Sequence, residues 1–181
     1  MIRFKGKFLI EHVLDAALNS ELGSVVLVLG YRYKTVLDAM AEKIRHPRLL
    51  VAINGRYRSG LSSSIKAGLR KVQKKFPSAM FLLGDQPMVN NEYINLLLNC
   101  FWASEKSICA PVFQGMRGNP VILTSRWYDR LTTLSGDVGA RDIIASNHQE
   151  LLEVCVYNQL LFIDIDTISD LSAIDEGQSG C

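Results

Sequence analysis

A short apolar run that ends in an acidic turn constrains the fold of this chain more than any other stretch. Residues 80–87 read Met-Phe-Leu-Leu-Gly-Asp-Gln-Pro. A continuous apolar run ended by a turn is typical of a parallel strand that is buried on both faces. Ligands bind beyond the carboxyl ends of strands in open α/β sheets, so Asp85 is expected at a ligand-binding edge. Its position suits a helix cap equally well, because a helix is expected over residues 93–102.

The rest of the chain alternates buried strands with amphipathic helices. Further strands are expected at residues 24–30, 49–53, 107–112, 121–123, 154–156 and 161–163, and further helices at 9–18, 34–44, 62–72, 127–134 and from 140 and 169. The strand at 121–123 follows a tight turn, so we expect it to be antiparallel and near an edge. This order predicts an α/β fold with a Rossmann-like, doubly wound, mostly parallel sheet. Neither an internal repeat nor an interdomain linker is visible, so residues 1–181 are expected to form a single domain.

The composition argues against several classes of protein. Hydrophobic residues make up 48% of the chain and charged residues 21%, which is ordinary for a globular protein. The net charge of +2, from 20 basic and 18 acidic residues, is too balanced for a nucleic-acid-binding surface. The four cysteines lack the spacing of a disulfide framework or a zinc site, and no apolar run has the length of a membrane span. A cytoplasmic protein without nucleic-acid or membrane partners is expected.

A second pair of carboxylates, Asp164 and Asp166, follows another expected strand. Mg²⁺ is typically held by one or two carboxylates together with substrate phosphates. Asp85, Asp164 and Asp166 are therefore candidate ligands of a hard divalent cation that assists phosphate chemistry. Asp166 with Thr167 is also an ordinary helix-start pattern, and the spacing alone leaves both interpretations open.

Three glycine-containing segments carry the other candidate residues. These residues are Gly60, Ser62, Ser63, Ser64, Asn119, Gly136, Asp137 and Arg141. Residues 60–64 place free backbone amides and hydroxyls at a helix N-terminus, which favours a phosphate, ribose or base contact. The glycines of segments 118–120 and 136–141 allow close backbone approach, and Arg141 can pair with an anion. Helix capping explains the serines equally well, and ordinary turns explain the other two segments.

Five segments occur together in an order that is typical of one family. They are residues 54–64, 84–87, 118–120, 136–141 and 164–167. Each segment is a weak signal alone, but the five in register closely resemble the molybdenum cofactor cytidylyltransferases. These belong to a wider class of nucleotidyltransferases that includes the guanylyltransferase of the same pathway. The resemblance covers nearly the whole chain and favours the metal-ligand interpretation of Asp85 over capping.

The resemblance implies transfer of CMP from CTP to the terminal phosphate of molybdopterin, with release of pyrophosphate and with Mg²⁺ as cofactor. CTP is expected in preference to GTP. Asp85 and Asp166 would be the catalytic metal ligands, with Asp164 as the less favoured second carboxylate. Residues 60–64 would line the nucleotide, and Gly84 and Gln86 would contribute to binding beside Asp85. The residues implied on the pterin side are Asn119, Gly136, Asp137 and Arg141.

Family members begin with a strand and a signature loop of the form Leu-Ala-Ala-Gly-x-Ser-x-Arg-Met-Gly, which wraps the triphosphate, and this sequence contains neither. The strand would be central in the sheet, so its neighbours are expected to have unpaired edges and exposed apolar surface. Residues 1–181 alone are then expected to bind triphosphate poorly. An upstream start, a degenerate homologue, or coverage of the gap by another chain in a homo-oligomer would each explain the departure.

A non-enzymatic function is the competing hypothesis. A pterin-binding accessory or chaperone protein for molybdenum hydroxylases would keep the acceptor half of the site and lose the nucleotide half. Asn119 stands where the family usually has a histidine, although asparagine can still form hydrogen bonds. Transfer from GTP, or to another phosphorylated acceptor, is the remaining enzymatic alternative, since the fold supports the reaction class better than the substrate.

Overall fold

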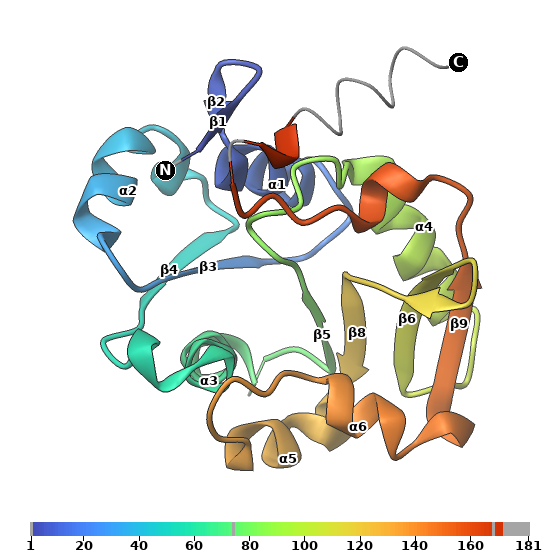
Figure 1. Ribbon diagram of the computed structural model, residues 1–181. Coiled ribbons are helices and arrows are strands. Elements are labelled where there is room, and N and C mark those ends of the chain that lie inside the picture. The colour runs from blue at the N-terminus through green and yellow to red at the C-terminus, as the bar shows by residue number, and fades with distance from the viewer. Residues whose placement is uncertain (1, 74, 168, 172–181) are drawn as a thin grey trace.

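Helices and strands alternate along the chain, of which the computed structural model describes residues 2–73, 75–167 and 169–171 (Figure 1). The strands are β1 (Arg3–Phe4), β2 (Lys7–Phe8), β3 (Val25–Leu29), β4 (Leu49–Ile53), β5 (Ser78–Phe81), β6 (Ile108–Phe113), β7 (Met116–Arg117), β8 (Val121–Thr124) and β9 (Leu151–Cys155). The α-helices are α1 (Leu9–Leu18), α2 (Tyr33–Ala39), α3 (Leu61–Val72), α4 (Asn91–Trp102), α5 (Tyr128–Thr133) and α6 (Arg141–Ala145). None of the helices in these ranges has both the length and the apolar character needed to cross a membrane.

The main strands form two sheets with a break between β3 and β5. β3 pairs in parallel with β4, and the pairing runs from Val25 with Leu49 to Leu29 with Ile53. The second sheet has the order β5-β8-β6-β7, and β9 lies parallel to β6. Among the described residues no ladder joins β3 to β5, so each of these strands has one unpaired edge. The expected unpaired strand edges are therefore found at β3 and β5.

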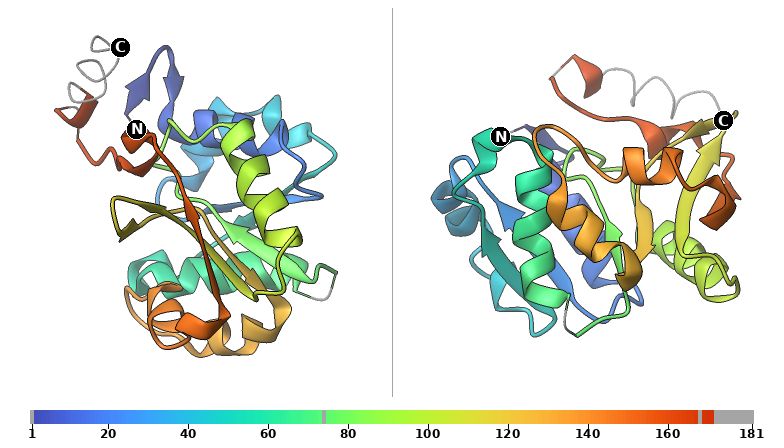
Figure 2. Two further views of the ribbon diagram at one scale, coloured as in Figure 1. Left: turned by 90° about the vertical axis from the view of Figure 1, so that its right-hand side faces the viewer. Right: turned by 90° about the horizontal axis from the view of Figure 1, so that it is seen from below.

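Helices cover both faces of the strands. α1 packs against α4 on one face, whereas α3 packs against α5 on the other (Figure 1). Seen from below, α3 and α5 lie side by side (Figure 2). The first layer buries Ile94 and Leu97 of α4, and the second buries Leu131 of α5 and Ile143 of α6, in two separate apolar cores. The predicted α/β, doubly wound architecture is confirmed.

β8 is antiparallel and near an edge of its sheet, as expected, because its neighbour β5 is the edge strand. It lies between β5 and β6 and pairs with both. The turn between β6 and β7 is made by Gln114 and Gly115, whose φ angles of 48° and 80° are both positive. Two such residues form the tight hairpin turn that matches strand twist. The chain then returns beside β6 as β8, and the other side of β8 pairs with β5.

The strand expected at residues 161–163 is a 3-10 turn, Gln159–Phe162. Asn158 causes this, because its Oδ1 accepts a hydrogen bond from Leu160 N at 3.0 Å and fixes the turn locally. Phe162 packs on Phe113 with 5.8 Å between ring centroids, so the apolar segment is covered without joining a sheet. The helix expected at residues 34–44 also stops early, at Ala39. The helix expected from residue 169 falls mostly outside the described residues.

The segment between β5 and α4 is fixed by a helix cap. Asn90 Oδ1 accepts a hydrogen bond from Tyr93 N at 2.8 Å, and Val89 N donates to Gln86 O at 3.2 Å. Asn90 is therefore the N-cap of α4, and the capping interpretation of Asp85 is wrong. These bonds hold the turn that leaves Asp85 beyond the carboxyl end of β5.

Asn90→Ala is expected to lower the free energy of unfolding by about 1 kcal/mol, because the amide of Tyr93 loses its capping acceptor. Asn99→Ala is the matched control, since Asn99 is an exposed residue inside the same helix and alanine is a better helix former. Urea denaturation of the two variants measures the difference. Equal stability of both variants would show that the cap does not matter.

Candidate functional site

Asp85 has an unusual environment for a carboxylate. Its side chain is half-buried, and its Oδ1 is buried without a hydrogen-bond partner in the structure. Its backbone carbonyl accepts a hydrogen bond from Ile165 N at 2.9 Å, which joins the turn after β5 to the segment that carries Asp164 and Asp166. An unpaired buried carboxylate oxygen is unfavourable unless another group satisfies it. Asp85 therefore has an acceptor oxygen free for a ligand.

Asp164 lies beside this turn and is held by Gln86. Gln86 is only 3% exposed, and its Nε2 donates to Asp164 Oδ1 at 2.8 Å. Burial raises the pKa of Asp85 above its ordinary value, a hydrogen bond within its own residue opposes this, and the charges of Asp164 and Asp166 raise it further. The structure thus brings the three predicted carboxylates into one electrostatic neighbourhood at the carboxyl edge.

Asp166 is exposed, and its neighbour Asp170 makes the local cap. Asp170 Oδ2 accepts hydrogen bonds from Asp166 N at 3.0 Å and Thr167 N at 2.7 Å. These two hydrogen bonds to backbone amides, with a further one from the Thr167 side chain, lower the pKa of Asp170 against the effect of desolvation. The Asp166 carboxylate accepts a hydrogen bond from neither of these two amides, so Asp170 and not Asp166 acts as the capping residue here.

The three carboxylates do not converge on a ready-made metal site. Within the described residues no group of three His, Cys, Asp or Glu side chains is arranged to hold a metal ion. The unpaired Oδ1 of Asp85 and the unpaired, buried Oε1 of Gln86 are nevertheless oxygen donors of the kind that Mg²⁺ prefers. The residues at this edge therefore fit a hard cation chemically.

The turn at Gly60 and the turn at Gly136 form one unit, although they are far apart in sequence. A Cβ atom on Gly60 would lie 2.3 Å from the Gly136 carbonyl carbon, and Gly60 has φ 88° and ψ 178°. Asp137 Oδ1 accepts a hydrogen bond from Leu61 N at 3.1 Å, and Gly136 O accepts one from Ser62 N at 3.2 Å. Ser63 N donates to Gly60 O at 3.1 Å. The amides at the start of α3 that we expected to be free are thus occupied.

Asn54 organises the serines and was not among the predicted site residues. Its Nδ2 donates to Ser63 Oγ at 2.8 Å and to Ser64 Oγ at 3.1 Å, and its Oδ1 accepts from Arg56 N at 2.9 Å. Ser62 is only 2% exposed, so it contributes to packing. The signal that could have identified Asn54 is its position directly after β4, at the carboxyl end of a strand.

A large cavity connects several of the remaining predicted residues. It has a volume of about 1370 Å³, lies between β3 and β5, and includes Ser64, Gly84, Asn119, Asp137 and Arg141 in its lining. The backbone oxygen of Asn119 accepts a hydrogen bond from the Tyr93 hydroxyl at 3.3 Å. The three carboxylates, Gln86, Gly60, Ser62, Ser63 and Gly136 do not line this cavity. The predicted residues therefore fall into three sets, which are the carboxylates with Gln86, the residues that line the cavity, and the residues of the contact between the Gly60 and Gly136 turns.

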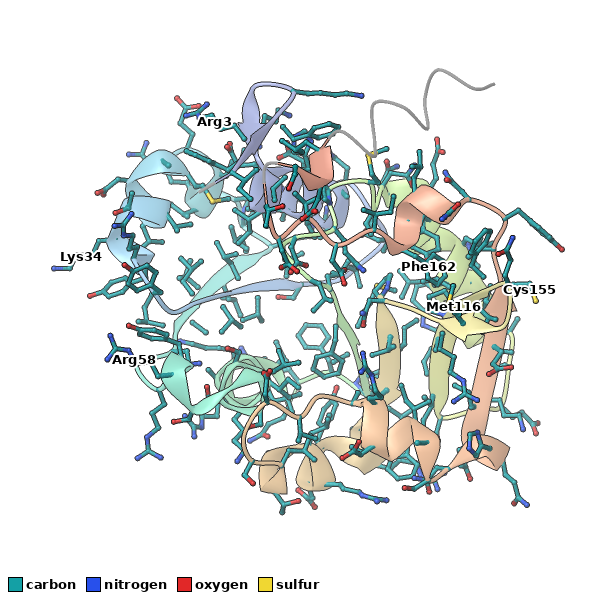
Figure 3. The ribbon with its side chains drawn as sticks, in the orientation of Figure 1. Arg3, Lys34, Arg58, Met116, Cys155 and Phe162 are labelled. Atoms are coloured by element: carbon teal, nitrogen blue, oxygen red, sulfur yellow. The ribbon has the colours of Figure 1, made fainter. Side chains whose placement is uncertain are left out.

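A cluster of tyrosines and arginines lies after β3 and β4 and was also missed. The Tyr31 and Tyr57 rings have centroids 6.0 Å apart, with Arg32 over the first ring and Arg58 over the second. Tyr31 is 64% exposed. Arg58 lies on the β3–β4 side of the molecule, away from Met116 and Phe162 (Figure 3). The signal in the sequence is a pair of tyrosine- and arginine-rich runs, each of which follows a strand.

Comparison with protein families identifies the class of protein to which the chain belongs. Residues 1–151 match the family model of the MobA-like NTP transferase domain. The chain belongs to this family. It is therefore a nucleotidyltransferase by class, and the resemblance drawn from the sequence motifs is confirmed at that level. No curated protein matches the chain significantly.

Several solved structures share the fold. The Rv0371c complex with manganese from Mycobacterium tuberculosis H37Rv has a TM-score of 0.81 at 22% identity, and the match covers 97% of this chain and 90% of that one. The 4-diphosphocytidyl-2C-methyl-D-erythritol synthase from Anaerococcus prevotii has a TM-score of 0.76 at 11% identity, and the match covers 98% of this chain and 88% of that one. Molybdopterin-guanine dinucleotide biosynthesis protein A from Archaeoglobus fulgidus has a TM-score of 0.65 at 18% identity, and the match covers 99% of this chain and 90% of that one. At these identities the likeness shows the fold of nucleotidyltransferases.

Gly60→Ala is expected to lower the free energy of unfolding by about 2 kcal/mol or more, because the backbone of Gly60 is in a region that only glycine occupies readily and because a Cβ would meet the Gly136 backbone. Gly55→Ala is the control, since a Cβ there meets nothing within 4 Å. Thermal and urea denaturation measure both variants. A Gly60→Ala protein as stable as Gly55→Ala would contradict the close contact between the two turns.

Proposed function

We propose that this protein transfers CMP from CTP to the phosphate of a molybdopterin-type acceptor in a Mg²⁺-dependent reaction. The observation that carries the proposal is the buried, unpaired Oδ1 of Asp85 at the carboxyl edge, next to Asp164 and Asp166. In this reaction an acceptor phosphate oxygen forms a bond to the α-phosphorus, the bond between the α- and β-phosphates breaks, and pyrophosphate leaves. Positioning and electrostatics supply most of the catalysis in such transfers.

The three carboxylates at the carboxyl edge would form the cation site. Asp85 and Asp166 would be its ligands, and Gln86 would keep Asp164 oriented beside them through its hydrogen bond. Bound Mg²⁺ supplies neutralisation of the negative charge on the phosphates. The charges of Asp164 and Asp166 contribute to the raised pKa of Asp85. A cation bound here would relieve this repulsion among the three carboxylates.

The serines bound by Asn54, two arginines of the loop after β4, and residues that line the cavity would position the two substrates. The hydroxyls of Ser63 and Ser64, fixed by Asn54, suit the hydroxyl groups of a ribose, and Arg56 and Arg58 suit the triphosphate charge. Asn119 and Arg141 line the cavity between β3 and β5 and would face the acceptor. The preference for CTP over GTP rests on the motif resemblance, since the similar structures include both a cytidyl-forming synthase and a guanine dinucleotide biosynthesis protein.

Asp85→Asn is expected to reduce nucleotidyl transfer by about 100-fold or more, because the charge that holds the cation is removed. The same variant should unfold at the same temperature as the unchanged protein or at a higher one, since asparagine removes a buried like charge. Pyrophosphate release from CTP with molybdopterin measures the first effect, and thermal denaturation measures the second.

Asp129→Asn is the control, because Asp129 is an exposed carboxylate on α5, away from the carboxyl edge. It should leave both readouts unchanged. Mn²⁺ binding followed by electron paramagnetic resonance in the presence of CTP gives a readout that does not require turnover. Mn²⁺ binding by Asp85→Asn as tight as in the unchanged protein would refute the metal assignment.

A further inference from the structure

The turn that carries Asn119 is held by two aromatic side chains from distant parts of the chain. The Tyr93 hydroxyl, on α4, donates a hydrogen bond to the backbone oxygen of Asn119 at 3.3 Å. The Phe162 ring lies against Gly118, because a Cβ on Gly118 would be only 2.3 Å from Phe162 Cε1. The close backbone approach that the glycine of segment 118–120 allows is therefore made by a side chain of the protein itself.

Both aromatic side chains are fixed by the apolar core beneath α4. Tyr93 is only 4% exposed, and burial raises its pKa, so the hydroxyl keeps the proton that it donates. Phe162 is half-buried and packs on Phe113 of β6. Phe113 pairs with Met116 across the hairpin, and Phe162 and Met116 lie on the same side of the molecule (Figure 3). The two rings are thus parts of the packed structure and can hold a turn in place.

The two side chains come from the two segments that carry the carboxylates. Tyr93 lies in the first turn of α4, directly after the segment that begins at Asp85. Phe162 lies two residues before Asp164. The backbone hydrogen bond that Asp85 O accepts from Ile165 N joins these segments to each other. The contacts therefore close a ring, in which the Gly118–Asn119 turn has a set position relative to the carboxylates.

The Asn119 side chain is available for a ligand. It is half-buried and lines the cavity, and it makes no hydrogen bond to the part of the chain that the structure describes, whereas its backbone oxygen is used by Tyr93. A side-chain amide offers both a donor and an acceptor, and hydrogen bonds are directional. Recognition by Asn119 therefore requires that its turn be held in one orientation.

We propose that Tyr93 and Phe162 are positioning residues for acceptor binding, which hold the Gly118–Asn119 turn and so fix the Asn119 amide relative to the carboxylates. The inference rests on the proposed function in one respect, namely that Asn119 faces the acceptor. Loss of either contact is expected to weaken acceptor binding and to spare nucleotide binding. The reason is that Ser63 and Ser64 are held by a different residue, Asn54, which follows β4.

Tyr93→Phe tests the hydrogen bond, because it removes only the hydroxyl and keeps the ring in the core. It is expected to raise the KM for molybdopterin by about 10-fold and to leave the KM for CTP unchanged. Tyr128→Phe is the matched control, since Tyr128 is also 4% exposed and its hydroxyl donates to the Phe76 carbonyl at 3.4 Å in the other apolar core. Equal acceptor KM values in the two variants, or an equal rise in both KM values of Tyr93→Phe, overturn the proposal.

Phe162→Leu tests the other contact, because leucine is apolar but lacks the ring that lies against Gly118. The acceptor KM is expected to rise here as well. Phe101→Leu is the control, since Phe101 is 6% exposed in the same core and should leave the acceptor KM unchanged. Both proposed residues act on one turn, so the double variant with Tyr93→Phe should show less than the product of the two single effects. A full product would mean that they act independently and would overturn the shared role.

NMR of the Asn119 side-chain amide gives a readout that does not require turnover. Its signals are expected to shift and broaden in Tyr93→Phe and in Phe162→Leu, because the turn loses a contact, and to stay unchanged in both control variants. Unchanged Asn119 signals in all four variants overturn the proposal. If the unchanged protein transfers no nucleotide to molybdopterin, the proposed function fails, and the NMR comparison still decides whether Tyr93 and Phe162 hold the turn.

Discussion

Two backbone hydrogen bonds between distant parts of the chain hold the carboxyl edge of the sheets together. Ile165 N donates to Asp85 O at 2.9 Å, and Ser62 N donates to Gly136 O at 3.2 Å. The first places three carboxylates in one neighbourhood, and the second joins the start of α3 to the turn before α6. Each loop alone has many conformations, so these contacts are needed to hold the loops next to one another at the carboxyl edge. The arrangement of the candidate site depends on them.

The edge keeps a destabilising feature that packing alone does not require. Asp85 is half-buried, has an unpaired oxygen, and is repelled by Asp164 and Asp166. Proteins commonly keep perturbed carboxylates where they bind ligands, at the expense of stability. Asn90 caps α4 and Gln86 Nε2 binds Asp164 nearby, whereas Gln86 Oε1 is a second buried oxygen without a partner. Two unpaired buried oxygens beside like charges distinguish this position from ordinary turns.

The sequence predicted the layers better than the details of the edge. Hydrophobic periodicity placed α1 and β4 at their observed bounds, because burial on a fixed face imposes a regular pattern. It failed at residues 161–163, where the Asn158 side chain favours a turn over a strand. It also did not show that Asp137 occupies an amide of α3, because that contact joins residues 76 positions apart. Contacts of this kind depend on tertiary structure and leave no local signal.

The break between β3 and β5 has a consequence for motion. The serines ordered by Asn54 lie on the β3–β4 side of the break, and Asp85 lies on the β5 side. In the described residues their separation is set by helix packing and by the Gly60–Gly136 contact, without a ladder between the two strands. Packed helices slide more readily than paired strands shear, since sliding breaks no backbone hydrogen bonds. The distance between the hydroxyls of Ser63 and Ser64 and the carboxylate of Asp85 therefore depends on helix packing rather than on strand pairing.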